Sequence, residues 1–256
     1  MRAEIYHRTI VSLLVLLLGL PVAATLAYSF ATRWGATVLP DGFTLSWYVQ
    51  LWQDQRFLAA FFRSLVVGFG TLAIGTVVVV PAAFVVFYRF PALDKVMGIL
   101  SLVPFAVPPV VSSVGLLHLY SDGPLPLVGT PWILVGCDLA IVLPFLYRAQ
   151  ANALGAINLR DLMDAAHILG AGTARAFLMV VFPLLRKGLM ASLFLSFSLL
   201  LGEFVFANIL VGTRYETLQV YLYNVRQVSG HFTSAAVMSY FFFTLVLTWL
   251  AARLGR

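Results

Sequence analysis

Charged side chains are scarce in this 256-residue chain. They make up 10% of its residues, whereas soluble proteins carry about 25%. Apolar residues make up 61%, and the mean hydropathy is +0.97. Too few polar side chains remain to cover a globule of this size in water, so most of the surface must face lipid. This excludes a soluble enzyme and a nucleic-acid-binding protein. The formal net charge of +6 reports membrane topology rather than a polyanionic partner.

Cysteine and histidine are nearly absent. Cys137 is the single cysteine, so no intrachain disulfide can form. His7, His118, His167 and His231 are scattered, and no cluster of Cys and His suggests a zinc, iron–sulfur or haem site. The patterns His-Glu-x-x-His and Gly-x-Ser-x-Gly do not occur, which argues against a protease or hydrolase inside the bilayer. We therefore expect no catalytic residue and no metal site in this chain.

Long uncharged runs separate the few charges. Several of these gaps exceed the roughly 20 apolar residues with which a helix crosses a bilayer, and they are continuous rather than alternating. The sequence therefore predicts an all-α integral membrane protein with a single transmembrane domain over residues 1–256. Its six transmembrane helices are expected near residues 10–30, 64–87, 97–120, 131–147, 189–211 and 232–252. Asp138 and Glu203 are the charged residues inside the fourth and fifth predicted spans.

The distribution of basic residues predicts the orientation. Eleven of the 16 Lys and Arg residues fall on the side that holds both termini, so both termini are expected in the cytoplasm. Arg2 and Arg8 before an apolar run also resemble a signal peptide, with an Ala-rich stretch near Ala23–Ala27 as a cleavage site. The run is longer than the apolar region of a typical signal peptide, and cleavage would leave an odd number of spans. We therefore expect the first helix to be retained.

Two connecting segments stand out by length. Residues 31–63, on the outer side, contain the turn signal Pro40-Asp41-Gly42 and then several aromatic residues, including Trp47 and Trp52. This composition is typical of a helix lying at the membrane interface. Such a helix can act as a membrane anchor or as a docking surface for an external partner. Residues 148–188 form the longest cytoplasmic segment.

Within the cytoplasmic segment, residues 158–183 predict a helical hairpin. Asn158 can cap a helix, with Asp161 placed to meet free backbone N–H groups at the positive end of the helix dipole. An apolar stripe follows at i, i+3, i+4 and i+7, made of Leu162, Ala165, Ala166 and Leu169. Small residues on that stripe allow another backbone to approach closely.

Glycine, threonine and proline then mark the turn and the second helix. Gly170 and Gly172 end the first helix, since glycine tolerates the left-handed conformation found at helix C-termini. Thr173 can cap a second helix, which Pro183 limits or kinks before the fifth span. The hairpin is suited to a groove on another protein; the alternative is an ordinary amphipathic hairpin at the membrane surface.

The hairpin carries a motif with fixed spacing. Asp164-Ala165-Ala166 is followed by three residues and Gly170, and then by twelve residues and Pro183. This resembles the EAA loop of the membrane permease subunits of type I ABC importers, the inner-membrane components of binding-protein-dependent transport systems. That pattern is Glu-Ala-Ala, three residues, Gly, nine residues, Ile, one residue and Leu-Pro. Both spacings match without a gap.

Three positions depart from the pattern while keeping chemical type. Asp164 replaces Glu, Val180 replaces Ile and Phe182 replaces Leu, and the shorter Asp164 has less reach. Looser similarities extend over the chain and resemble the polyamine, iron, thiamine and phosphonate branch of the family. They are Leu45-Ser46-Trp47-Tyr48, Phe57, Arg63-Ser64-Leu65, Pro104, Pro108, Pro109 and Leu201-Gly202-Glu203-Phe204.

The resemblance implies a permease subunit in a bacterial or archaeal plasma membrane. The first hairpin helix would be the coupling helix that docks on a cytoplasmic ATPase. The residues implied in coupling are Asp164, Ala165, Ala166, His167, Gly170 and Pro183.

No Gly-x-x-x-x-Gly-Lys-Ser/Thr occurs here, so this chain is not expected to be an enzyme or to bind a cofactor. ATP and Mg²⁺ would be bound by two partner ATPase subunits. The other implied partners are a second permease subunit, identical or homologous, and an external solute-binding protein; no nucleic acid is expected.

Acids, prolines and a histidine within the spans predict the residues of a transport path. A charge at mid-bilayer costs about 2.5–3.5 kcal/mol on insertion scales, so Asp138 and Glu203 should face protein or water. Pro108 and its neighbouring prolines should kink the third span and free backbone carbonyls, and His118 lies at the outer end of that span. We expect these four residues near the path. As alternatives, Glu203 bonds a neighbouring helix through Asn208 or Ser198, and Asp138 is structural.

Small residues recur at helix-packing spacing. They are Ser64, Gly68, Thr71 and Gly75 in the second span and Ser192, Ser196 and Gly202 in the fifth. These positions predict close helix contacts. Six spans rarely enclose a path for a hydrophilic solute, so a pair of such subunits is expected. The rival function is an ion-coupled secondary transporter, which would usually have more spans and would not need the cytoplasmic hairpin.

Overall fold

The computed structural model describes residues 2–122 and 124–254. Within these ranges the regular elements are helices, beside one isolated bridge between Ala31 and Phe43. The chain divides into two compact units. The first comprises Met1–Ala59 and Tyr221–Leu245, and the second comprises Ala60–Val220 and Val246–Arg256.

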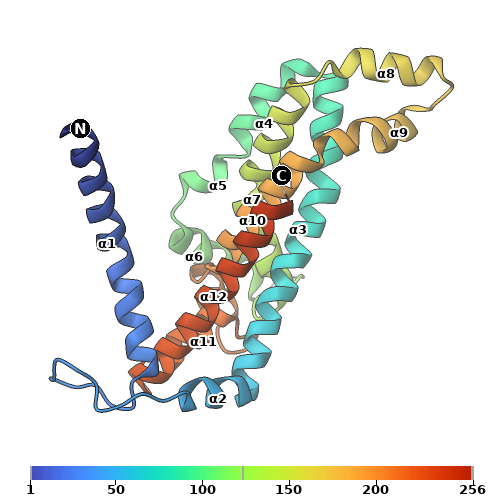
Figure 1. The fold of residues 1–256 in the computed structure, drawn as a ribbon. Coiled ribbons are helices and arrows are strands. Elements are labelled where there is room, and N and C mark those ends of the chain that lie inside the picture. The colour runs from blue at the N-terminus through green and yellow to red at the C-terminus, as the bar shows by residue number, and fades with distance from the viewer. Residues whose placement is uncertain (1, 123, 255–256) are drawn as a thin grey trace. The chain divides into compact units, whose positions relative to one another are not determined.

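The predicted all-α membrane fold is confirmed. Five helices in the described residues are long and apolar enough to cross a membrane, or six if one bent pair forms a single span. The five are Tyr6–Phe30, Gln55–Arg89, Pro131–Gly155, Thr173–Leu201 and Gly230–Leu250. The bent pair is Pro91–Ala106 with Pro109–Tyr120, whose axes differ by 87°. Figure 1 shows this change of direction between α5 and α6.

The first unit contains α1 (Arg2–Phe30), α2 (Ser46–Gln53), the start of α3 (Gln55–Arg89), most of α11 (Leu218–Val225) and most of α12 (Gly230–Leu254). A polar contact lies at its centre: the buried Tyr221 phenol donates to Asp54 Oδ2 at 2.5 Å, and the Phe57 ring lies 5.7 Å from that of Tyr221. In α1, by contrast, the side chains from Leu13 to Leu18 are 51–73% exposed. Six consecutive residues go around the whole helix, so α1 exposes apolar side chains on all sides, which suits lipid rather than water.

The second unit is built around α3, α7 (Pro131–Gly155) and α10 (Phe182–Leu201), and α7 packs along α10. Glycines let these helices approach closely, as the small-residue spacing predicts. A Cβ on Gly68 would lie 2.8 Å from the Phe197 ring, and one on Gly75 would lie 2.7 Å from Leu146. Gly202 was expected to share this role, but it is exposed at the C-cap of α10.

Prolines account for the break in the predicted third span. The segment comprises η1 (Pro91–Leu93), α4 (Asp94–Leu100), α5 (Val103–Ala106) and α6 (Pro109–Tyr120). Val107 is extended, with φ −109° and ψ 127°, and Pro108 has φ −56° and ψ 137°. Each precedes a proline, whose ring disfavours the helical conformation at the preceding residue. The chain therefore leaves the helix at Val107 and starts α6 in a new direction.

The predicted fifth span, residues 189–211, is also divided. One continuous helix runs from Thr173 to Leu201 through α9 (Thr173–Ala176), the π-helical turn η2 (Phe177–Val181) and α10. Glu203 and Phe204 are not helical, and a short helix then leads into the π-helical turn η3 (Ala207–Val211). The proline in the first turn of α10, Pro183, does not interrupt the helix, because the distortion is taken up by the π-helical turn before it.

Candidate functional site

The hairpin forms between α7 and α10, as the sequence predicts, and its first helix is α8 (Leu159–Ile168). The side chains that α8 buries are Leu159, Met163 and Ala166, at spacing i, i+4 and i+7. This face packs against α9 and η2. The predicted stripe lies mostly on another side of α8: Ala165 is exposed and Leu169 is 87% exposed, whereas Ala166 is buried within the hairpin. The second helix of the hairpin selects the buried face, and periodicity alone does not reveal its position.

Glycine terminates α8 as predicted. Gly170 has φ +81°, a left-handed conformation that side chains rarely adopt. The Gly170 N–H donates to the His167 carbonyl at 2.9 Å, and the Ala171 N–H donates to the Ala166 carbonyl at 3.0 Å. These two bonds form a Schellman motif, which satisfies carbonyls at the helix end. The reversal of the chain is therefore encoded by a few local residues.

The two predicted caps differ in detail from the structure. Asn158 occupies the N-cap of α8, but its side-chain amide donates to Asp161 Oδ2 rather than accepting a backbone N–H. The N-cap of α9 is Gly172, one residue before the predicted Thr173. The Thr173 hydroxyl lies 3.4 Å from His167 Nε2, so it joins the two helices of the hairpin instead.

The outer face of the hairpin is exposed. Asp164, Ala165 and His167 are exposed on α8, and Ile168 and Leu169 at its end are 86% and 87% exposed. Of the residues implied in coupling, Ala166 is buried and Pro183 is exposed at the start of α10. Figure 1 shows α8 and α9 projecting beyond α7 and α10. This hairpin presents small and apolar side chains to a second surface.

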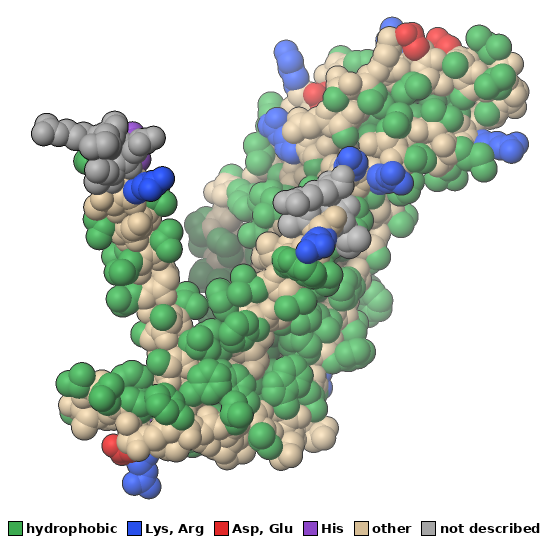
Figure 2. Space-filling view, in the orientation of Figure 1, with side chains coloured by type: hydrophobic (Ala, Val, Ile, Leu, Met, Phe, Trp, Pro, Cys, Tyr) green, Lys and Arg blue, Asp and Glu red, His purple; other side chains and the backbone are tan. Residues whose placement is uncertain are grey.

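Basic side chains gather around this end of the second unit. Figure 2 shows Lys and Arg atoms near α8, α9 and α4, whereas hydrophobic atoms cover much of the visible flank of the helices. Arg160, Arg175, Arg186 and Lys187 are all exposed. Such a distribution is typical of the cytoplasmic end of a membrane protein.

Glu203 lies at the break after α10. Its two carboxylate oxygens accept the backbone N–H groups of Phe206 at 2.7 Å and Ala207 at 3.0 Å. The carboxylate therefore caps the short helix that follows and interacts favourably with its positive end. This partner is backbone of the same segment, rather than Asn208 or Ser198. The half-buried Glu203 side chain therefore stabilises the helix after this break. Its place on the transport path stays a prediction.

Asp138 is the second intramembrane acid. Its side chain is 4% exposed on α7, and its Oδ1 has no hydrogen-bond partner among the described residues. It follows Cys137, which packs in one buried cluster with Phe206 and Ala207, the two residues whose backbone N–H groups Glu203 accepts. Asp138 and Glu203 therefore both adjoin members of this cluster.

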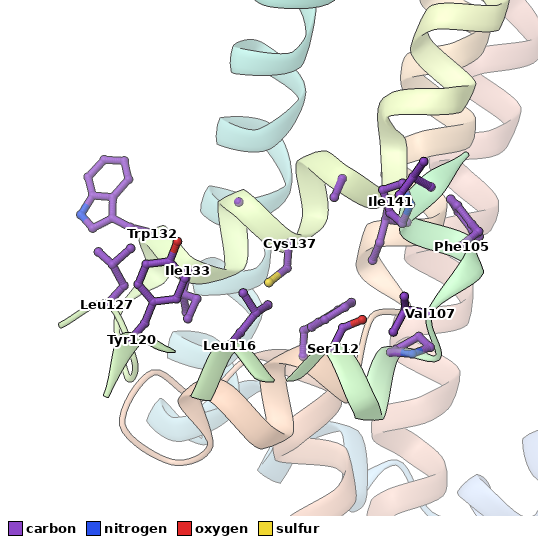
Figure 3. Close-up of a pocket in the computed structure, with 16 residues that line it drawn as sticks. Phe105, Val107, Ser112, Leu116, Tyr120, Leu127, Trp132, Ile133, Cys137 and Ile141 are labelled. Carbon is purple, nitrogen blue, oxygen red and sulfur yellow. The ribbon is translucent and has the colours of Figure 1, made fainter. Parts of the chain in front are cut away.

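A cavity of about 530 Å³ lies beside these residues, between the α5–α6 bend and α7. Figure 3 shows the Cys137 sulfur pointing from α7 toward this space, with Leu116 and Ser112 on α6. Pro104 and Pro109 line the cavity, whereas Pro108, His118, Asp138 and Glu203 are not among its lining residues. Pro108 instead serves as the N-cap of α6, and His118 is exposed in its last turn.

The lining of this cavity was largely missed from the sequence. The α7 residues in it are Trp132, Ile133, Gly136, Cys137, Ala140 and Ile141. They recur at i, i+1, i+4, i+5, i+8 and i+9, which places them on one face of a helix. The helical periodicity of these residues was therefore visible in the sequence, but an ordinary packed helix face produces the same pattern.

Comparison with known proteins agrees with the fold. Residues 75–256 match the family model described as binding-protein-dependent transport system inner membrane component. A putative 2-aminoethylphosphonate transport system permease protein, PhnV, of Salmonella typhimurium is 27% identical over 250 residues, covering 95% of this chain and 93% of that protein. The spermidine/putrescine transport system permease protein PotC of Escherichia coli K12 is 27% identical, with 82% and 78% covered.

The fold is also similar to that of a solved structure. A chain in the crystal structure of a bacterial ABC transporter involved in the import of the acidic polysaccharide alginate superposes with a TM-score of 0.72. The match covers 98% of this chain and 94% of that chain, at 14% sequence identity. At this identity the match shows a shared fold alone.

Proposed function

Because the chain belongs to the family of binding-protein-dependent transport system inner membrane components, we propose that it is one permease subunit of an ATP-driven importer. It forms half of the path for a small hydrophilic solute, and a second permease subunit forms the other half. An external binding protein delivers the solute. ATP and Mg²⁺ are bound by two cytoplasmic ATPase subunits, one of which receives the hairpin of this chain.

The hairpin is the observation that carries this proposal. It exposes Asp164 and Ala165 beside the apolar Ile168 and Leu169, at the end of the second unit where basic side chains gather. The Schellman turn at Gly170 ends α8 and reverses the chain toward α9. Because α8 packs on η2, which continues into α10, a displacement of α8 is transmitted directly to a membrane helix.

A cross-linking experiment tests the docking of the hairpin. Cys137 is the single cysteine, so a Cys137→Ala background permits one new thiol at a time. Leu169→Cys in this background should form an adduct with the ATPase subunit in native membranes, through a short thiol-reactive cross-linker. Mass spectrometry identifies the adduct, and ATP should change its yield. Val38→Cys, at a side chain that is 91% exposed in the outer loop, is the control and should give no such adduct. An equal ATPase adduct at both positions, or none at Leu169→Cys, contradicts the docking.

The solute is proposed from the relatives' names. PhnV is named for 2-aminoethylphosphonate and PotC for spermidine and putrescine, and these solutes share a primary ammonium group. We propose a solute carrying that group, in accord with two acids, Asp138 and Glu203, inside the bundle. Cells that lack this chain should lose uptake of radiolabelled 2-aminoethylphosphonate or putrescine, and the gene should restore it.

Energy coupling separates the proposal from its rival. Depletion of ATP at constant membrane potential should stop uptake, whereas an ionophore at constant ATP should leave it intact. The opposite pattern identifies an ion-coupled secondary transporter. If neither solute is taken up through this chain, the solute class is wrong, while the cross-linking result still decides whether the hairpin docks on an ATPase.

A further inference from the structure

A polar cavity of about 710 Å³ lies between α4 and the C-terminal half of α7, away from the Cys137 cavity. Its polar lining residues are Asp94, Lys95, Tyr147, Arg148 and Asn152. The Tyr147 phenol donates to Asp94 Oδ1 at 2.9 Å, so part of this carboxylate is already engaged. Neither Lys95 nor Arg148 forms an ion pair with a carboxylate among the described residues. The cavity therefore has two cations available for an anion and one partly engaged carboxylate.

The two cations come from the two helices that line the cavity, Lys95 from α4 and Arg148 from α7, and both side chains are exposed. The Arg148 guanidinium reaches from α7 to α4, where it lies 3.8 Å from the position that a Cβ on Gly98 would occupy. Lys95 is three residues before Gly98 on α4, so it lies one turn away on the same side of that helix. A guanidinium can donate two parallel hydrogen bonds to a phosphate, and the Asn152 amide adds a further donor. This set of donors matches a phosphate group.

An apolar groove continues from the polar cavity. It encloses about 910 Å³ between the α5 region, α7 and α10, and it shares Arg148 and Asn152 with the polar cavity. Elsewhere its lining is mostly apolar: large side chains form its walls, and Gly188 and Ala191 leave space on α10. The large side chains are Leu102, Phe105, Phe145 and Leu195. A polar site and an apolar groove thus meet at Arg148.

This arrangement matches an amphipathic anion rather than a free solute. The Lys and Arg distribution predicts that this end of α7 faces the cytoplasm, where anionic lipids concentrate. Basic pockets between transmembrane helices on that side are suited to phospholipid headgroups. From the joined cavities we infer that the second unit holds one anionic phospholipid: its phosphate lies between Lys95 and Arg148, and an acyl chain occupies the groove beside α10.

Lipid titration of the purified full chain tests this inference. Native mass spectrometry compares phosphatidylglycerol with phosphatidylcholine of the same acyl chains. Phosphatidylglycerol should bind the wild type at least about tenfold more tightly, since each Lys or Arg beside an anionic lipid strengthens binding several-fold. The double variant Lys95→Gln/Arg148→Gln should remove this preference. Arg175→Gln/Lys187→Gln removes the same charge from exposed positions outside both cavities and should retain it.

A groove variant and a competitor complete the test. Ala191→Phe fills the groove without changing charge, and it should weaken binding of both lipids while leaving thermal melting near that of the wild type. Sodium phosphate should compete poorly with phosphatidylglycerol. Equal affinity for the two lipids, equal loss in the two double variants, or full displacement by sodium phosphate would each overturn the lipid site. The last outcome would identify a site for free phosphate instead.

Discussion

The cytoplasmic hairpin and the broken helices of the second unit are built in opposite ways. The hairpin is held by local backbone bonds at Gly170 and by a few buried side chains, and its tip is exposed. The breaks at Val107 and Glu203 lie beside packed helices, where prolines remove backbone donors and a carboxylate satisfies others. The difference teaches where substitutions should act: in the bundle on stability first, and at the hairpin tip on transport first.

The largest effect is expected where two helices of the bundle meet. Gly75→Leu would place side-chain atoms against Leu146, which is fully buried and has little room to move. Overpacking of this kind costs roughly 1–3 kcal/mol, so the free energy of unfolding should fall by about that amount. Thermal melting in detergent and the amount of protein in membranes measure it, and transport should fall in parallel. Gly70→Leu is the matched control, because nothing lies within 4 Å of its Cβ position.

At the hairpin the opposite result is expected. Gly170→Val forces a β-branched residue into a conformation with φ +81°, at a strain of roughly 1–2 kcal/mol. That strain shifts the equilibrium about tenfold toward another conformation of the turn. Transport should therefore fall by a similar factor, while the melting temperature changes little. Gly172→Ala, at a position with φ −70° and open space, should transport like the wild type. A large drop in melting temperature for Gly170→Val, with normal transport per folded molecule, would remove the contrast between the two regions.

The same contrast explains what the sequence can predict. Uncharged runs locate the membrane helices, because lipid imposes a length and a composition on each span. Gly170 and the Asp164-Ala165-Ala166 spacing locate the hairpin, because its turn depends on residues close together in the chain. Positive φ at Gly170 was predicted for the same reason.

Features that depend on distant partners were not predictable in this way. The face that α8 buries within the hairpin is chosen by α9 and η2, so the sequence pattern did not reveal that Leu159 and Met163 belong to it. The end of α10 at Leu201 lies inside an apolar run, where composition does not separate one long helix from two shorter ones. Glu203 was predicted to face protein or water, but its backbone partners follow from the break itself.

The smallest effect on stability is expected at Glu203, where the structural and transport roles can be separated. In Glu203→Gln the side chain keeps one carbonyl oxygen to accept a backbone N–H, but its NH₂ group cannot accept the other. Loss of a capping bond costs about 1 kcal/mol, so the melting temperature should drop only slightly.

If capping is the sole task of Glu203, uptake per folded molecule stays at the wild-type level. If the carboxylate also attracts a cationic solute, uptake falls well beyond the loss of folded protein. Asp138→Asn supplies the comparison, because it removes the other intramembrane acid, whose Oδ1 makes no hydrogen bond among the described residues. An uptake defect shared by both variants places the two acids on the path, whereas a defect in neither confines Glu203 to closing the break after α10.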